Sequence, residues 1–63
     1  MVNGEELRVP VGTTVQDLCT RFRADPRHTA VERNRVIVAR AAFGTTVLQD
    51  GDVLEIVTLV GGG

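Results

Sequence analysis

The sequence is poor in aromatic residues. It contains two phenylalanines and neither tryptophan nor tyrosine among its 63 residues. Proteins that bind single-stranded nucleic acid stack bases on aromatic side chains, so this class of function is disfavoured. The formal net charge of −1 also argues against a surface that binds a phosphate backbone, because such surfaces are basic.

Cysteine and lysine are scarce as well. The single cysteine, Cys19, cannot form an internal disulfide, and no metal-ligand spacing surrounds it, so we predict no metal site. Lysine is absent, and all seven basic side chains are arginines. The only amine is therefore the N-terminus, and the chain cannot accept an isopeptide bond on a side chain. In any carboxyl chemistry it would be the donor.

Targeting and membrane signals are missing too. No charged-then-apolar signal segment opens the chain, and its longest apolar run is far shorter than the roughly 20 residues that span a bilayer. We therefore expect a soluble cytoplasmic protein. The length and a hydrophobic content of 43% fit one folded domain with a small core, because so short a chain buries only about 60% of its unfolded surface. We assign residues 1–60 to this domain and 61–63 to a flexible C-terminal tail.

The first eleven residues predict a β-hairpin. Asn3-Gly4 is a strong hairpin signal, because a type I′ turn needs positive φ at both central positions. Leu7, Val9 and Val11 then alternate with polar residues and with proline, which indicates one buried face. Because proline has no N–H, this arm is expected to end near residue 10 or to lie at a sheet edge.

A helix is predicted to follow. Thr13 and Gln16 have the spacing of a capping box. The apolar residues behind them recur at helical spacing and predict one buried stripe, formed by Val15, Leu18, Cys19 and Phe22. We expect the helix to end at residues 25–26, Asp-Pro.

The rest of the chain predicts strands and turns. In order, we expect a strand over 29–33, a turn at 34–35, a strand over 36–39, a short helical turn over 40–44 with Phe43 as its plug, a return strand over 45–48, a tight turn at 50–52 and a final strand over 53–60. The order β-β-α-β-β-β predicts an α+β fold, a sheet with one helix across it.

Four polar or nucleophilic residues could have functional roles, but a structural role explains each of them more simply. Cys19 lies on the helix's apolar stripe, where a free cysteine behaves as a small hydrophobe. His28 falls in a predicted loop with no residue spaced to orient it. Asp50 and Asp52 flank a glycine, and such carboxylates typically accept hydrogen bonds from their own turn. Without a set of nucleophile, base and orienting group, we do not expect an enzyme.

The final strand and the glycines after it are the candidate functional region. Leu54, Ile56, Thr58 and Val60 share one face of the strand, while Glu55, Val57 and Leu59 share the other. If the first set faces the helix, Val57 and Leu59 are exposed on the other side and could dock a partner. The run Val60-Gly61-Gly62-Gly63 has no side chain beyond the valine, so its three glycines suit insertion into another protein's active site.

These landmarks resemble the sulfur carrier protein of thiamine biosynthesis, a family with the ubiquitin-like β-grasp fold, a mixed sheet with one crossover helix. The resemblance extends over the whole chain and rests on Asn3-Gly4-Glu5, Gly12-Thr13-Thr14-Val15 with Asp17-Leu18, Asp50-Gly51-Asp52-x-Leu54-Glu55-Ile56-Val57 and Val60-Gly61-Gly62-Gly63. Two departures stand out. The family's first strand usually begins two or three residues earlier, and the turn at Asn34-Arg35 is more typically Asn-Gly.

The resemblance implies a function for the last residue. The carboxylate of Gly63 would be adenylated by a separate E1-like adenylating enzyme, which consumes ATP. Sulfur from a persulfide, made by a cysteine desulfurase or another source, would displace AMP, and the resulting thiocarboxylate would supply thiazole synthase. Gly61, Gly62, Val57, Leu59 and Val60 would contact these partners. The carrier itself would bind no cofactor, and neither nucleic acid nor a membrane is expected as a partner.

Two other assignments remain open from the sequence. The small sulfur-carrier subunit of molybdopterin synthase shares the fold and a terminal Gly-Gly but is typically longer, and carriers for cysteine synthesis or tRNA thiolation are also possible. Small β-grasp modules fused to some aminoacyl-tRNA synthetases and GTPases bind ligands or RNA and have similar motifs. Such internal modules have no reason to end in glycines.

Overall fold

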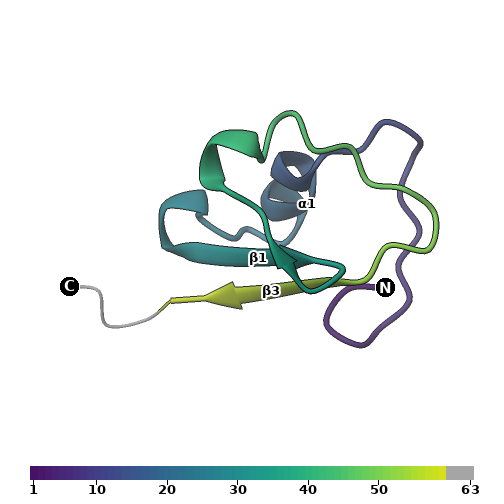
Figure 1. The fold of residues 1–63 in the computed structure, drawn as a ribbon, viewed down its shortest axis with the longest axis horizontal. Coiled ribbons are helices and arrows are strands. Elements are labelled where there is room, and N and C mark those ends of the chain that lie inside the picture. The colour runs from purple at the N-terminus through teal and green to yellow at the C-terminus, as the bar shows by residue number, and fades with distance from the viewer. Residues whose placement is uncertain (60–63) are drawn as a thin grey trace.

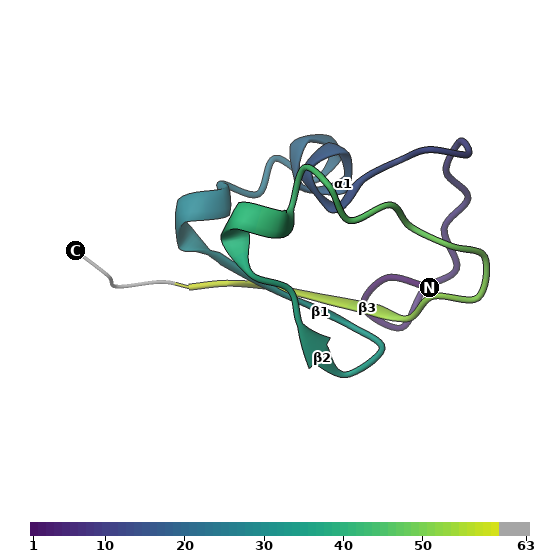
Figure 2. The same cartoon turned by 45° about the horizontal axis from the view of Figure 1, so that its top comes forward.

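The computed structural model describes residues 1–59 and shows one helix packed against one face of a three-stranded sheet (Figures 1 and 2). The sheet order is β2-β1-β3, and both neighbouring pairs are antiparallel. The predicted α+β class is therefore confirmed. The elements run in the order α1 (Val15–Arg21), the 3₁₀ turn η1 (Pro26–His28), β1 (Thr29–Arg33), β2 (Val36–Ile37), the 3₁₀ turn η2 (Arg40–Ala42) and β3 (Leu54–Thr58).

The N-cap of the helix lies one residue later than predicted. Thr14, not Thr13, is the N-cap: its hydroxyl accepts from the Asp17 backbone N–H at 3.1 Å, and the Asp17 carboxylate accepts from the Thr14 N–H at 3.0 Å. A carboxylate at this position also interacts favourably with the positive end of the helix dipole, which a Gln16 amide cannot match. Thr13 instead closes the preceding turn by donating to the Pro10 carbonyl.

Both predicted asparagine turns form. Asn3 and Gly4 have φ values of 50° and 81°, and Val2 and Glu5 exchange two backbone hydrogen bonds across them. Asn34 also has positive φ, at 53°, and Arg35 follows at 69°, so arginine takes the conformation that glycine more often supplies. Positive φ at both central positions is the type I′ pattern, which matches the twist of paired strands.

The second arm of the N-terminal hairpin is shorter than predicted. Within residues 1–59 no strand forms over 6–11, because the N–H and C=O of Met1 bond to Asp52 and Leu54 rather than continuing the ladder toward Glu6. This contact is parallel, a single bridge from Val2 to Leu54. Val11 was predicted to be buried and is fully exposed, because the turn after Pro10 directs it to solvent.

Three other predicted strands are also shortened. The predicted 36–39 strand is reduced to β2 and the 45–48 strand to one bridge between Thr14 and Val47. Of the predicted 53–60 strand, the part that lies within the described residues is reduced to β3.

The core lies between α1 and the sheet. It is formed by Val2, Val15, Leu18, Cys19, Val31, Phe43 and Leu54. Phe43 is 2% exposed and follows η2, as predicted for a plug. Phe22, predicted on the buried stripe, is 47% exposed because the helix ends at Arg21 and Phe22 is its C-cap.

Candidate functional site

The two faces of β3 differ in solvent exposure, as the alternation of its residues predicts. Leu54 is buried and Ile56 packs against the core, whereas Val57 and Leu59 are more than half exposed. Val57 lies opposite Ala30 of β1 on the side of the sheet away from α1. The structure thus places Val57 and Leu59 on the helix-free face, and their role in partner binding stays a prediction.

The end of β3 is held along both of its edges. On one side it pairs with β1 over its whole length. On the other side the Asn3 side chain accepts from the Ile56 N–H at 2.7 Å and donates to its carbonyl at 3.2 Å. The Leu59 N–H then bonds to the His28 carbonyl at 2.6 Å. The last described residues, at the end of β3 (Figure 1), are therefore fixed to the rest of the fold.

The remaining candidate residues follow Leu59 in the sequence. Val60, Gly61, Gly62 and Gly63 lie outside the described residues, as do the predicted tail and the last residue of the predicted 1–60 domain. The last described residue before them, Leu59, is exposed on the helix-free face.

A hydrogen-bond network around the buried Asp52 carboxylate stabilises the start of β3. Asp52 is 9% exposed and accepts from the Arg33 Nε at 2.8 Å, from Asn34 Nδ2 at 3.0 Å and from the Gln49 N–H at 2.8 Å. Sequence reasoning found only the bond within the turn, because nothing in the spacing connects residue 52 to Arg33. The network fastens the turn between β1 and β2 to the residues that begin β3.

Two carboxylates have perturbed titration for structural reasons. Burial raises the pKa of Asp52, but the hydrogen bonds from Arg33, Gln49 and Asn34 outweigh it, so the net pKa is lowered. The exposed Asp25 has its pKa lowered to about 2, chiefly by the side-chain hydrogen bond from Arg27. Both groups hold the fold in place, and neither lies beside a nucleophile.

These shifts predict acid destabilisation. A carboxylate whose pKa is depressed by folding stabilises the native state above its unfolded pKa of about 3.9, and this stabilisation is lost as the pH falls through the folded value. We expect the urea midpoint to fall steeply between about pH 5 and pH 2. Asp52→Asn should reduce the free energy of unfolding at pH 7 by about 1–3 kcal/mol, a modest figure because the Arg33 side chain is 32% exposed. The urea midpoint of this variant should also fall less steeply between about pH 5 and pH 2. Urea titrations at several pH values, followed by far-UV circular dichroism, test these expectations. A variant whose urea midpoint falls with acid as steeply as that of the wild type would contradict them.

The two other candidate reactive side chains, Cys19 and His28, differ in exposure. Cys19 is fully buried, and burial raises the pKa of its thiol, which disfavours the nucleophilic thiolate. His28 is exposed at the end of η1. Among residues 1–59 no three His, Cys, Asp or Glu side chains gather as a metal site would require. The structural readings of Cys19 and His28 are confirmed.

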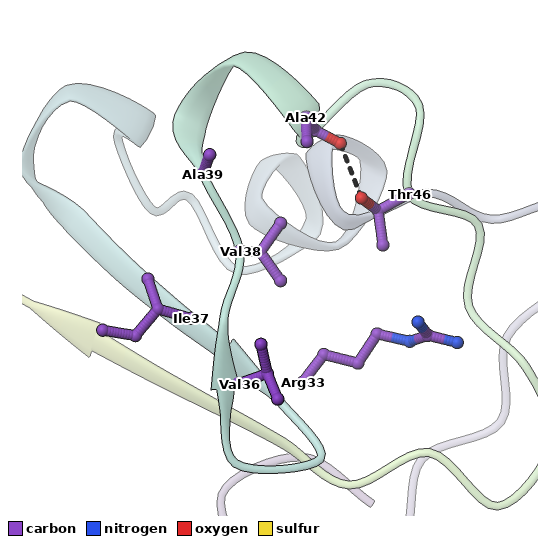
Figure 3. A pocket seen from close by; sticks show the side chains of 7 residues that line it. All are labelled: Arg33, Val36, Ile37, Val38, Ala39, Ala42 and Thr46. Atoms are coloured by element: carbon purple, nitrogen blue, oxygen red, sulfur yellow. Dashed lines mark hydrogen bonds between the residues drawn. The ribbon is translucent and has the colours of Figure 1, made fainter.

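A small hollow opens beside β2, shown in Figure 3. Its volume is about 250 Å³, and it is lined by Arg33, Val36, Ile37, Val38, Ala39, Ala42 and Thr46. The lining is mostly apolar, and the Thr46 hydroxyl is already bonded to the Ala42 carbonyl at 2.7 Å. Since Arg33 is bonded to Asp52, this hollow offers no free catalytic pair.

In the part of the chain that the structure describes, none of the helices has the length and apolar character needed to cross a membrane.

Comparisons with known proteins give consistent matches. The family model described as "ThiS family" matches residues 1–63. The chain is 36% identical over 63 residues to the sulfur carrier protein ThiS of Bacillus subtilis (strain 168), covering 98% of this chain and 96% of that protein. It is 31% identical to the thiamine biosynthesis protein (ThiS) from Geobacter metallireducens, whose crystal structure superposes with a TM-score of 0.77 over 98% of this chain and 94% of that one.

A longer relative is also similar. The chain is 40% identical over 62 residues to a thiazole synthase of Magnetococcus marinus, a match that covers 98% of this chain. The chain spans about a fifth of that protein's length, 19%.

Proposed function

The chain belongs to the ThiS family, and on that premise we propose that it is a sulfur carrier of thiamine biosynthesis. The observation that carries the proposal is the family match over residues 1–63, which joins the β-grasp body to the glycine run that follows β3. The similarity to the Bacillus sulfur carrier over nearly the full length of both proteins supports the same function. It also favours the thiamine branch over the molybdopterin synthase subunit and over an internal regulatory module.

The proposed chemistry takes place at the carboxylate of Gly63. An oxygen of this carboxylate attacks the α-phosphorus of ATP in the adenylating enzyme, and pyrophosphate leaves. A persulfide sulfur, supplied by a cysteine desulfurase or another donor, then attacks the acyl carbon and AMP leaves. A second thiol breaks the S–S bond to the donor and leaves a thiocarboxylate on the carrier. Adenylation is needed because the oxygen of a carboxylate is a poor leaving group.

The carrier acts in this scheme as a co-substrate, and its partners supply the catalysis. The burial of the Cys19 thiol, which disfavours the nucleophilic thiolate, supports this division. Thiazole synthase is the proposed sulfur acceptor. The thiazole synthase with a segment similar to this chain supports that pairing.

Docking is proposed to use the helix-free face of β3. Val57 is 55% exposed and Leu59 57% exposed, and in the sequence they lie four and two residues before the first glycine of the run. Exposed apolar side chains grouped beside a reactive end are suited to protein contact. Gly61 and Gly62, with Val60, would then run through the partner's channel.

Mass spectrometry of the intact protein tests this function. After incubation with ATP, a ThiS-adenylating enzyme and a persulfide source, we expect the mass to rise by the difference between one sulfur and one oxygen. Omitting ATP should prevent the change. If the mass stays constant while the same mixture converts the Bacillus sulfur carrier, the proposed function is wrong.

A further inference from the structure

Two glutamates face each other on the helix-free side of the sheet. Glu32 of β1 and Glu55 of β3 are register partners, and both are exposed. Directly opposed residues on neighbouring strands have Cβ atoms about 4.5–5.5 Å apart, and like charges in this position are destabilising.

No cation of the described chain relieves this repulsion. Within residues 1–59 the salt bridges join Arg27 to Asp25 and Arg33 to Asp52, and neither glutamate takes part in a side-chain hydrogen bond. Arg33 is adjacent to Glu32 in sequence, but alternation along β1 sends its side chain to the other face, where Asp52 holds it.

The two carboxylates are framed by apolar side chains. Ile37 of β2 lies opposite Glu32 and is 72% exposed, so one row across the three strands reads Ile37, Glu32, Glu55. The neighbouring row on the same face pairs Ala30 with Val57. The view in Figure 2 shows α1 and the 3₁₀ turns gathered on the opposite side of the sheet.

A partner that covers this face must therefore meet both kinds of group. Covering Ile37 and Val57 also removes water from Glu32 and Glu55, and an ionised carboxylate withdrawn from water is costly unless it is paired. A guanidinium can bond both carboxylates through its fork of N–H donors, and an ammonium can bridge them as a point charge.

We propose that the helix-free face binds a surface of the adenylating enzyme on which an arginine or lysine is surrounded by apolar side chains. This basic side chain lies between Glu32 and Glu55 in the complex. The inference rests on the proposed function for the identity of the partner. The chemistry of the contact comes from this face alone: a cation at its centre, and apolar side chains against Ile37, Val57 and Leu59.

The test is the double variant Glu32→Gln with Glu55→Gln, which keeps size and removes both charges. Its dissociation constant for the adenylating enzyme, measured by surface plasmon resonance, should rise about tenfold or more, equivalent to about 1.4 kcal/mol. Its affinity should also depend less on salt than that of the wild type, because screening weakens charge pairs. The control is Glu5→Gln with Glu6→Gln, which changes net charge equally at two exposed sites outside β1, β2 and β3 and should bind like wild type.

Folding is checked separately by circular dichroism, where removal of the opposed charges should leave the free energy of unfolding unchanged or higher. The inference fails if the double variant binds as tightly as wild type, or if the control loses as much affinity. If the wild type is charged with sulfur while the double variant binds normally, this inference alone is wrong. A wild type that is neither bound nor charged contradicts the proposed function and the inference together.

Discussion

Deleting Gly63, or extending the chain by one residue beyond it, is expected to lower thiocarboxylate formation about a hundredfold or more, because displacement of a reacting group by about 1 Å already costs this much. One residue of extended chain spans about 3.3–3.6 Å, so either change moves the carboxylate far from the position where ATP is attacked. The folded body should be unaffected, since every residue of the core lies between Val2 and Leu54. Intact-mass measurement of charging and circular dichroism of the same samples test both parts.

A matched control uses the other end of the chain. One residue added before Met1 should leave charging unchanged, because the N–H that bonds to the Asp52 carbonyl at 2.9 Å can be supplied by a peptide group as well as by an amine. If the shortened and C-terminally extended proteins are charged like wild type, the carboxylate of Gly63 is not the reactive group.

The second large effect concerns the fold that supports this end. Phe43→Ala is expected to cost about 3–5 kcal/mol, the range for removing a buried phenylalanine. A domain of this size has a total stability of only about 3–9 kcal/mol, at about 0.05–0.15 kcal/mol per residue. The variant should therefore lose about a third or more of its stability, and at the lower end of this range the loss exceeds the total and the variant is unfolded.

The other phenylalanine of the chain is the control. Phe22 is 47% exposed where Phe43 is 2% exposed, so Phe22→Ala should cost under about 1 kcal/mol. Because the chain has no tryptophan or tyrosine, urea unfolding is followed by far-UV circular dichroism. Equal losses in the two variants would show that Phe43 is not the central core residue.

Local signals in the sequence predicted local structure well. The Asn3-Gly4 turn, the strand over 29–33 and the turn at Asn34-Arg35 depend on backbone preferences of neighbouring residues, and all three form. The cap was misplaced by one residue because Thr13 and Thr14 are chemically alike, and only the position of Asp17 distinguishes them.

Long-range contacts were beyond sequence reasoning. The bond between Arg33 and Asp52 joins residues 19 apart, and no spacing rule connects them. The register that sets Glu32 against Glu55 depends on how β1 and β3 pair, which alternation alone does not fix. By contrast, period-2 alternation along β3 placed Val57 and Leu59 on the exposed face, because only one face of that strand can pack against the helix.

The candidate site was predicted from composition and resemblance rather than from geometry, and its role stays a prediction. Glycines have no side chains to form a pocket, so the sequence indicates this candidate site only as a run of three glycines after the last predicted strand. The structure adds the anchoring of β3 by the Asn3 side chain and of Leu59 by the His28 carbonyl, which holds the last described residues in place.

Fragmentation of the sulfur-charged protein in a mass spectrometer locates the added sulfur atom. We expect the added sulfur on the C-terminal fragment, where it replaces an oxygen of Gly63. Sulfur found instead on the fragment that contains Cys19, as a persulfide released by reducing agents, would contradict this expectation.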